Sequence, residues 1–307
     1  MKVLVTGGAG FIGSNLVDKL LALNHEVVVI DNLYTGNKEY INPKAKFYNM
    51  DIRGKNIIEV FEEEQFDIVY HLAAQVDVNR SIINPKFDSD INIAGIINIL
   101  DNCMKYNIRK IIYSSSAAIY GEPKYLGIDE KHPINPVSFY GLSKYTAENY
   151  IKLYSKLYGF KYTILRYANV YGIRQNKKGE GGVIAKFIDM MLNNEIPIIY
   201  GDGTQTRDFI FVDDVIEANI LAMERGDNEI LNIGSGEEIS VNDLLNMLKK
   251  IFNIQIEPLF KSERKGDIKH SFFNINKAYK SIGWKPKYSL YNGLIRTVNF
   301  YRSGFFE

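Results

Sequence analysis

Short apolar runs alternate with amphipathic stretches through the first half of the chain. Runs rich in Val, Ile and aromatic residues predict strands at 2–6, 26–30, 46–49, 67–71, 110–115 and 162–166. Helical patterns lie between them at 11–23, 56–64, 87–106 and 138–158. This alternation indicates a parallel sheet covered by helices on both faces. Right-handed crossovers then give a doubly wound α/β fold, which binds ligands at the carboxyl ends of its strands.

The regular alternation stops after Arg166, where loops and isolated helices follow. Glycines cluster at 179–182 and 201–203, and a further strand pattern appears at 229–234. We therefore predict a large sheet domain at 1–166 with a return segment at 204–235. Residues 167–203 and 236–307 should form a smaller α/β substrate-binding domain.

Composition and charge narrow the functional classes. The 307 residues are 46% hydrophobic and 24% charged, with a net charge of +1, so no electrostatic field favours nucleic acid or a membrane surface. The single cysteine, Cys103, rules out an internal disulfide and is typical of a reducing compartment, so we expect a cytoplasmic protein. No apolar run approaches the roughly 20 residues of a membrane helix. We expect no signal peptide, because the first strand begins at Lys2.

Tyr140 and Lys144 are the leading candidates for chemistry. They stand four residues apart on the predicted helix 138–158 and therefore share one face of it. An ammonium beside a phenol favours the phenolate, which brings a group with an ordinary pKa of about 10 toward acid/base use near neutral pH. The alternative is an amphipathic helix on which the tyrosine packs and the lysine is solvated.

Glycines 7, 10 and 13 favour the catalytic interpretation, because they join the first strand to the first helix. Such glycines permit a tight turn, close approach of the backbone to a pyrophosphate, and close helix packing. Asp31 ends the second strand, where a carboxylate can accept hydrogen bonds from ribose hydroxyls and would repel a 2′-phosphate. This favours NAD over NADP; the alternative for Asp31 is a turn or cap residue.

Several further residues are weaker candidates. Asp51 follows the third strand and could bond an adenine amine or be a solvated turn acid. The small side chains of Ala73 and Ala74 would let a flat cofactor lie close to the fourth strand. His71, just before them, is more typical of a buried, hydrogen-bonded histidine than of a catalyst. The four histidines and one cysteine show no metal-ligand spacing, so we expect no metal site.

In order along the chain, these segments resemble the extended short-chain dehydrogenase/reductase family, specifically nucleotide-sugar epimerases of the UDP-glucose 4-epimerase type. The matching motifs include Thr6-Gly7-Gly8-Ala9-Gly10-Phe11-Ile12-Gly13, Ser114-Ser115-Ser116-Ala117-Ala118-Ile119-Tyr120-Gly121, Tyr140-Gly141-Leu142-Ser143-Lys144 and Arg264-Lys265-Gly266-Asp267. The resemblance implies a Rossmann sheet, bound NAD and a UDP-sugar substrate. It implies C4 epimerisation by hydride removal and return through a 4-keto intermediate.

The resemblance also implies individual roles. Tyr140 would be the acid/base, Lys144 would lower its pKa and bond the nicotinamide ribose, and Ser116 would bond the sugar 4-hydroxyl. The implied cofactor contacts are Gly7, Gly10, Phe11, Ile12, Gly13, Asp31, Asn32, Thr35, Gly36, Asp51, Ile52, Leu72, Ala73, Ala74, Asn92, Ser114, Tyr140, Lys144 and Tyr167. The implied substrate contacts are Ser116, Tyr140, Asn169, Val183, Tyr200, Arg207, Arg264, Asp267 and Ser271.

Alternatives remain for some of these assignments. Two of the three serines at 114–116 could simply bond their own backbone at a polar strand end. Arg207 and Arg264 match diphosphate-binding positions, where the planar guanidinium suits phosphate, but could be solvated surface residues. Ser271 matches a position beside the sugar's C2 substituent, where a small residue would leave room for an acetamido group; an exposed turn residue is the alternative.

Neighbouring activities are less favoured by the sequence. In the resembling 4,6-dehydratases and uronate decarboxylases, an acidic residue follows the serine or threonine of the fifth strand, where this chain has Ala117 and Ala118. A non-enzymatic NAD sensor would be expected to lack Ser116, Tyr140 or Lys144, and all three are present.

The helices at 87–106 and 138–158 carry more apolar residues than one buried stripe requires. We therefore expect a homodimer in which the two helices form a four-helix bundle across a two-fold axis, as the resemblance also implies. The alternative is that loops or the C-terminal segment cover the extra apolar face.

Overall fold

A seven-stranded parallel sheet forms the centre of the computed structural model, which describes residues 1–176, 182–263 and 268–303. The strand order is β11-β6-β5-β4-β1-β2-β3, and every neighbouring pair is parallel. The strands are β1 (Lys2–Thr6), β2 (Glu26–Asp31), β3 (Lys46–Asn49), β4 (Ile68–His71), β5 (Lys110–Ser116), β6 (Lys161–Tyr167) and β11 (Glu229–Ile233). The predicted doubly wound parallel sheet is confirmed.

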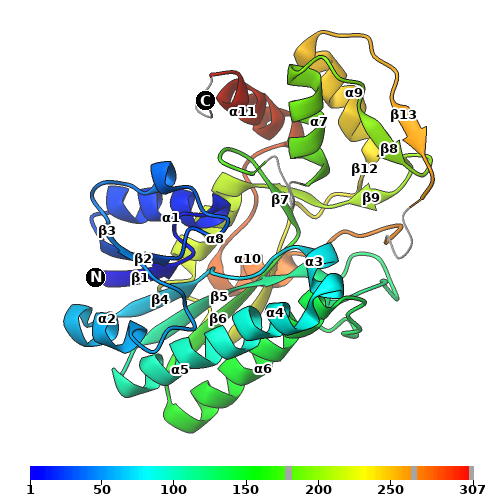
Figure 1. Ribbon diagram of the computed structural model, residues 1–307. Helices are drawn as coiled ribbons and strands as arrows, with labels where there is room; N and C mark the ends of the chain where they lie inside the picture. The colour runs from blue at the N-terminus through cyan, green and yellow to red at the C-terminus, as the bar shows by residue number, and fades with distance from the viewer. Residues whose placement is uncertain (177–181, 264–267, 304–307) are drawn as a thin grey trace.

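Helices cover both faces of this sheet (Figure 1). One core lies under α1 (Phe11–Ala22) and α8 (Val212–Leu221), and the other lies under α2 (Ile57–Glu64), α5 (Gly95–Lys105) and α6 (Phe139–Tyr158). Successive residues of β1 point to opposite faces, so Val3 and Val5 enter the first core while Leu4 enters the second. Near-continuous apolar strands are the consequence of two buried faces.

The predicted helix 87–106 is not one continuous α-helix. It begins as α4 (Pro85–Ser89), passes through a π-helical turn, η2 (Asp90–Ala94), and continues as α5. A short helix before it, α3 (Val78–Ile83), was not predicted. The side chains of Asp77 and Asn84 each accept a backbone N–H and cap α3 and α4, so two separate helices form. The extra residue of a π turn often marks a functional position, and here it lies within η2 around Asn92.

A smaller group of elements begins directly after β6 and occupies the upper right of Figure 1. Its strands pair as β7 with β10 and β8 with β13, both parallel, and β9 with β12 antiparallel. The elements are β7 (Asn169–Tyr171), α7 (Val183–Leu192), β8 (Ile198–Tyr200), β9 (Thr206–Arg207), β10 (Phe209–Phe211), β12 (Ile239–Ser240), α9 (Val241–Phe252), β13 (Leu259–Lys261) and α11 (Leu290–Arg302). The remaining short helices are η1 (Lys38–Tyr40), η3 (Ala117–Ile119) and α10 (Asn276–Ile282).

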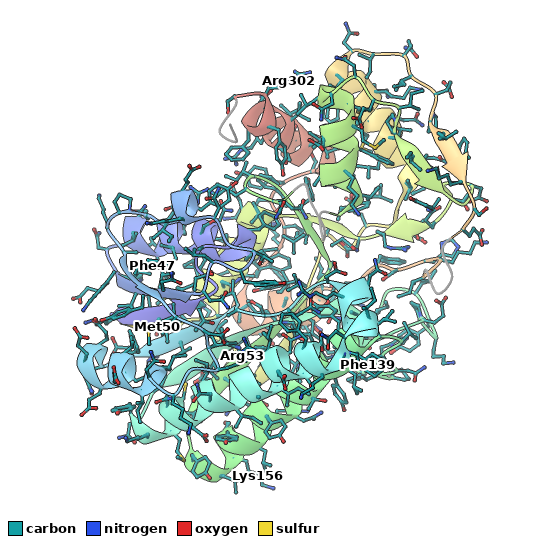
Figure 2. The ribbon with its side chains drawn as sticks, viewed as in Figure 1. Phe47, Met50, Arg53, Phe139, Lys156 and Arg302 are labelled. Carbon is teal, nitrogen blue, oxygen red and sulfur yellow. The ribbon has the colours of Figure 1, made fainter. Side chains whose placement is uncertain are left out.

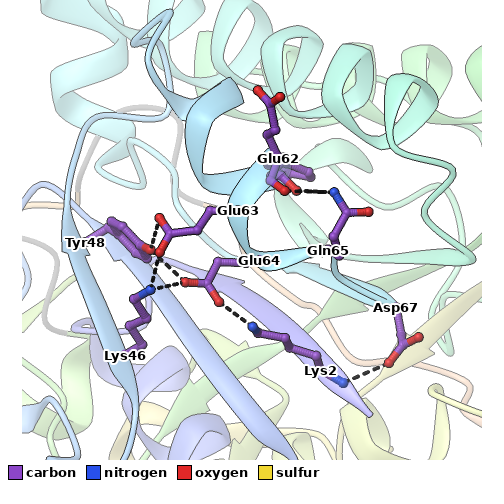
Figure 3. A network of polar contacts seen from close by, with 9 residues as sticks. Lys2, Lys46, Tyr48, Glu62, Glu63, Glu64, Gln65 and Asp67 are labelled. Atoms are coloured by element: carbon purple, nitrogen blue, oxygen red, sulfur yellow. Dashed lines mark hydrogen bonds and ion pairs between the residues drawn. The ribbon is translucent and has the colours of Figure 1, made fainter.

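Charged side chains fasten α2 to the amino ends of the strands (Figure 3). Glu64, which ends α2, forms ion pairs with Lys2 at the start of β1 and Lys46 at the start of β3, and accepts a 2.6 Å hydrogen bond from Tyr48 Oη. Burial alone would raise the pKa of Glu64, but its bonds to these groups lower that pKa to about 2. The network stabilises the end of the sheet opposite to the strands' carboxyl ends.

Among the described residues, none of the helices combines the length and the apolar character required to cross a membrane.

Candidate active site

The turn from β1 into α1 requires glycine at two positions, one in the loop and one in the first turn of the helix. Gly7 has φ of +74°, and a Cβ there would lie 2.6 Å from the amide nitrogen of Ala73. A Cβ on Gly13 would lie 2.1 Å from the carbonyl oxygen of Gly7, so this glycine lets the helix meet the loop. Gly10 is the N-cap of α1 and has no side chain to bond the first amides of the helix. The amino end of α1, with Phe11 and Ile12 in its first turn, is therefore suited to an anionic ligand.

Asp31 connects the end of β2 to this loop. Its Oδ2 accepts a 3.0 Å hydrogen bond from the backbone nitrogen of Ala9, and its Oδ1 accepts one of 2.8 Å from that of Leu33. Burial raises the pKa of this carboxyl, and the two backbone bonds offset part of that effect. Each carboxylate oxygen has a second lone pair, so the group can still accept bonds from a ligand. Gly36 packs against it, since a Cβ there would lie 2.9 Å from Asp31 Oδ1.

The residues predicted near the adenine end lie at the surface beside Asp31. Asn32 and Thr35 are exposed. Asp51 accepts bonds from Arg53 at 2.7 and 2.8 Å and from Asn32 Nδ2 at 2.9 Å. The Arg53 guanidinium lowers the pKa of Asp51 to about 2, so this acid is an ionised member of a surface ion pair. Ile52, next in sequence, is buried.

The end of β4 carries small, half-buried residues, Leu72, Ala73 and Ala74, as a surface for a flat ligand requires. His71 before them shares a 2.8 Å hydrogen bond with Thr6 Oγ1. Burial, with a smaller contribution from the Lys144 cation, lowers the pKa of His71 to about 3, so the ring is neutral. The structure therefore agrees with the buried, hydrogen-bonded interpretation of this histidine.

Asn92 lies behind this surface and is 3% exposed. Its Oδ1 accepts a 2.8 Å bond from the backbone nitrogen of Gln75, and its Nδ2 lies within hydrogen-bond distance of Gln75 O, Asp88 Oδ1 and Ser143 Oγ. These bonds fix the loop after β4 against α6. In this structure the amide of Asn92 is thus engaged with protein groups.

Tyr140 and Lys144 lie in the first turns of α6, which pack against the end of β5. Ser138 caps the helix by accepting a 3.1 Å bond from Gly141 N. A Cβ on Gly141 would lie 2.4 Å from the carbonyl oxygen of Ala118, so this glycine lets α6 approach the residues after Ser116. Figure 2 labels Phe139 at this end of α6 and Lys156 near the opposite end. Tyr140 is largely buried at this end of the helix, with 9% of its surface exposed.

The side chain of Lys144 points toward the end of β5 and lies beside Tyr140. Its Nζ donates a 2.8 Å hydrogen bond to the carbonyl oxygen of Ser114 and lies 6.0 Å from the centre of the Tyr140 ring. Burial lowers the pKa of Lys144 to about 8, and negative charges on Asp88 and Glu148 oppose that shift. The lysine is thus a cation held beside the tyrosine in a largely water-free environment.

The three serines of β5 behave differently from the expectation that two would bond their own backbone. Ser114 Oγ donates to Tyr167 Oη at 3.2 Å, and Ser115 Oγ donates to Glu148 Oε1 at 2.6 Å. Only Ser116 bonds nearby backbone, accepting a 3.2 Å bond from Ala118 N, and its hydroxyl proton remains available to a ligand. That expectation was wrong because side chains from α6 and β6 reach the first two hydroxyls.

A cavity of about 420 Å³ opens among the smaller elements. Its lining brings together four of the predicted substrate residues, which come from β7, α7, β8 and β9: Asn169, Val183, Tyr200 and Arg207. The backbone and side-chain nitrogens of Asn169 donate to the carbonyl oxygen of Asp208, which fixes β7 to β10. Gln175 and Gln205 also line the cavity; the sequence analysis missed them, because neither belongs to a recognisable motif.

Ser271 is half-buried between two anchored neighbours. His270 shares hydrogen bonds of 3.1 Å with Thr206 and Glu238, and the carbonyl oxygen of Phe272 accepts a 2.9 Å bond from Ile128 N. Arg264 and Asp267 lie outside the described residues. No cluster of three or more His, Cys, Asp or Glu side chains suited to a metal ion occurs within the described ranges.

Two buried acids near the site, Glu148 and Asp88, were also missed. Glu148 follows Lys144 by one helical turn and forms a doubly hydrogen-bonded ion pair with Arg166. The i, i+4 spacing from Lys144 could have identified Glu148. Asp88 stands four residues before Asn92, and it was missed because α4 was predicted as part of a longer amphipathic helix.

Together, the glycine loop, the order of the strands and the Tyr140–Lys144 pair beside β5 define the class of doubly wound dinucleotide-binding proteins. The chain belongs to the NAD dependent epimerase/dehydratase family, whose model matches residues 3–234.

Individual relatives match almost the whole chain. A protein of Methanocaldococcus jannaschii, whose assignment as a UDP-glucose 4-epimerase is provisional, is 53% identical over 302 residues, 98% of each chain. The UDP-glucose 4-epimerase of Thermotoga maritima, solved with UDP-glucose, is 45% identical, with a TM-score of 0.97 over 99% of each chain. The UDP-N-acetylglucosamine 4-epimerase of Methanobrevibacter ruminantium, solved with UDP-N-acetylmuramic acid, is 36% identical, with a TM-score of 0.95 over 99% of each chain.

Proposed function

We propose that this protein is an NAD-dependent isomerase that inverts C4 of a UDP-sugar. The observation that carries the proposal is the place of Tyr140, Lys144 and Ser116 at the carboxyl end of β5. In the sheet, β5 lies between β4 and β6. Beyond β4 lies β1, which leads into the glycine loop, and β6 leads into the cavity strand β7. A group at this point can reach both a cofactor and a sugar. The matched epimerases support the same activity.

The glycine loop fits NAD, because a Cβ at Gly7 or Gly13 would fill the space that the turn requires. The residues proposed to hold the cofactor are those of the loop, Asp31 and its neighbours, the surface after β4, and Lys144. Bound NAD would accept a hydride from C4 and return it. The cofactor is regenerated in each cycle and needs no second substrate.

The protein's own side chains would manage the proton. Tyr140 Oη takes the proton of the 4-hydroxyl as the sugar is oxidised, and the Lys144 cation stabilises the phenolate. The Ser116 hydroxyl can donate to the sugar oxygen or accept from it as its charge changes. After the 4-keto sugar turns its other face, Tyr140 returns the proton. Arg207 and Arg264 are proposed to bind the diphosphate, with Asn169, Val183, Tyr200 and Asp267 around the nucleotide and sugar.

Product analysis separates this proposal from its alternatives. Purified protein would be incubated with UDP-galactose, UDP-glucose, UDP-N-acetylglucosamine and UDP-glucuronic acid, and the products separated by chromatography with mass detection. Epimerisation changes retention at constant mass, a dehydratase product loses water, and a decarboxylase product loses carbon dioxide. We expect only constant-mass products, because half-buried alanines follow Ser116 in place of an acid. A mass loss, or no conversion of any of the four sugars, would refute the proposal.

Asp31 should determine the preference for NAD. Replacing Asp31 with serine should weaken NAD binding, because the substitution removes an acceptor for the ribose hydroxyls. It should also reduce the ratio between the Kd values for NADP and NAD, because it removes a charge that repels a 2′-phosphate. Calorimetric titration of apo protein with both cofactors gives the two Kd values. Asp213→Ser, which removes a surface acid paired with Arg296 and outside the proposed cofactor contacts, is the control. Equal or tighter binding of NADP by the unmodified protein would contradict the carboxylate argument.

A second candidate substrate class is the UDP-N-acetylhexosamines, which Ser271 favours. A serine at a position beside the C2 substituent leaves room for an acetamido group, and one matched structure is a UDP-N-acetylglucosamine 4-epimerase. Ser271→Tyr should therefore depress kcat/KM for UDP-N-acetylglucosamine at least tenfold more than for UDP-glucose, by steric exclusion. Equal losses for both substrates would show that position 271 does not select them.

We also propose a homodimer that buries α5 and α6 against the same helices of a second chain. The two helices pack side by side, and Leu153, Leu157 and Tyr158 of α6 are 51–61% exposed in the single chain. A molar mass of one chain by light scattering at micromolar concentration would exclude this assembly. A cytoplasmic location is proposed on the single, buried Cys103.

We propose the predicted division into a sheet domain at 1–166 with a return at 204–235, and a substrate domain at 167–203 and 236–307. The first part of the return, β9 and β10, pairs with β12 and β7 of the smaller group. The pairing of β11 with β6 supports the return segment. Limited proteolysis tests this division. If the division is correct, the earliest cleavage sites should lie near its boundaries.

A further inference from the structure

The ammonium group of Lys144 lies in a closed environment, since the residue is 3% exposed. Besides its bond to Ser114 O, Nζ lies 4.9 Å from the centre of the Tyr113 ring. The titratable and charged groups around it come from each element packed there: His71 of β4, Asp88 of α4, Tyr113 of β5, Tyr140 and Glu148 of α6, and Arg166 of β6. A buried lysine loses its proton readily unless negative charge is near.

The two acids in this set, Glu148 and Asp88, differ in how strongly their negative charges act on Lys144. Glu148 is fully buried, and both of its oxygens are bonded by Arg166, at 3.0 and 2.7 Å. The opposite charge of the guanidinium cancels much of the field of Glu148 at any third group. Asp88 is 1% exposed, and no cation among the described residues pairs with it. Its charge therefore acts on Lys144 without such cancellation.

Neutral amides hold Asp88 in place. Its Oδ1 accepts bonds from Gln75 Nε2 at 2.8 Å and Asn92 Nδ2 at 3.2 Å, while its buried Oδ2 receives no hydrogen bond from the described residues. The same Asn92 amide lies 3.1 Å from Ser143 Oγ, and Ser143 Oγ donates to Tyr140 O at 3.0 Å. The acid is thus tied by two intermediate residues to the turn of α6 that carries the acid/base pair.

We propose that Asp88 is a positioning residue that keeps the Lys144 ammonium protonated and, through Asn92 and Ser143, holds the first turns of α6 in place. The final step, from the charge on Lys144 to the reactivity of Tyr140, rests on the proposed epimerase function. The electrostatic step does not.

The direction of the effect follows from the charges. Burial lowers the pKa of Lys144 to about 8, and Asp88 is the larger of the two charges that oppose this shift, ahead of Glu148. Removing the Asp88 charge therefore lowers the pKa further. Lys144 would then be mostly neutral at pH 8 and would no longer favour the Tyr140 phenolate.

Lysine NMR measures this pKa without any catalytic assay. Protein labelled with ¹³C at lysine Cε is titrated from pH 6 to 11, and the Lys144 signal is assigned by its loss in Lys144→Met. In Asp88→Asn, which keeps the size and an acceptor oxygen, the midpoint for Lys144 should fall by about one pH unit or more. Asp88→Glu should restore most of the shift. Asp90→Asn, which changes a half-buried acid two residues further along the chain at the start of η2, should leave the midpoint unchanged.

An unchanged Lys144 midpoint in Asp88→Asn would overturn the proposal, as would an equal shift in Asp90→Asn. In the active enzyme, the alkaline limb of the kcat/KM profile should move down with the NMR midpoint; a uniform loss at every pH would point to structural damage and count against the charge effect. Should Asp88→Asn fail to fold, Asp88→Ser takes its place. Failure of both to fold would overturn the proposal, because Asp88 would then be a requirement of the fold and not a positioning residue. A shifted midpoint in a protein that epimerises nothing would refute only the proposed function.

Discussion

Turnover should fall by about 10²- to 10⁴-fold in Tyr140→Phe, while NAD binding stays nearly unchanged. The substitution deletes one oxygen, the one proposed to carry the proton of the sugar 4-hydroxyl, and leaves the packing of the ring intact. Steady-state kinetics with UDP-galactose and titration with NAD measure the two effects separately.

Tyr150→Phe is the matched control for this variant. It removes the same oxygen from a half-buried tyrosine two to three turns further along α6, away from Lys144. Its kcat should stay within about twofold of the unmodified protein, as expected for a tyrosine remote from the reacting atoms. A Tyr140→Phe enzyme that retained most of its kcat would remove this tyrosine from the mechanism.

The free energy of unfolding should fall by about 3–5 kcal/mol in Glu148→Gln. Glu148 is 0% exposed and Arg166 is 2% exposed, so the substitution leaves the guanidinium charge buried without its counter-ion. Burial alone would lower the pKa of Arg166, but the bonds from Glu148 raise it above its ordinary value, so the arginine cannot shed its charge. The same guanidinium donates to Tyr120 Oη at 2.8 Å, which extends the damage to the residues after β5.

Urea unfolding followed by circular dichroism measures this loss. Glu217→Gln provides the control, because Glu217 pairs with Lys287 at 3.2 Å at the surface, where an ion pair contributes at most about 1 kcal/mol. Equal effects of the two substitutions would mean that the buried pair contributes no more than an exposed one.

The sheet could be predicted from the sequence because its strands are buried on both faces. Continuous apolar runs such as Val27 to Ile30 leave few alternatives to a central strand. The π turn at η2 could not be predicted, because a one-residue insertion does not alter the amphipathic pattern around it. The short α3 was missed for a different reason: it is stabilised by its Asp77 cap and by packing on α6, with a mostly exposed apolar surface that gives no periodic signal.

The candidate site divides in a similar way. Gly7, Tyr140 and Lys144 stand in motifs whose spacing follows from local geometry, so the sequence identifies them. Arg166 acts through contacts with Glu148 and Tyr120, which lie 18 and 46 residues away in the chain, and no local pattern reports such a contact. The hydroxyl partners of Ser114 and Ser115 belong to this second group, which explains why backbone bonding was the wrong expectation for both.

The position of β11 sets an order of events during synthesis. β6 is the edge of the large sheet until residues 229–233 are made, and an uncovered edge strand is open to pairing with another chain. The side chain of Asn232 on β11 also accepts a 2.7 Å bond from Tyr120, the partner of Arg166. The segments that form the glycine loop and α6 therefore leave the ribosome well before β11 is made. Until then, the buried ion pair of Glu148 and Arg166 lacks the cover that β11 provides through Tyr120. A nascent chain that stalls between β6 and β11 would carry a nearly complete nucleotide-binding sheet with an open edge, and is the form of this protein most exposed to aggregation.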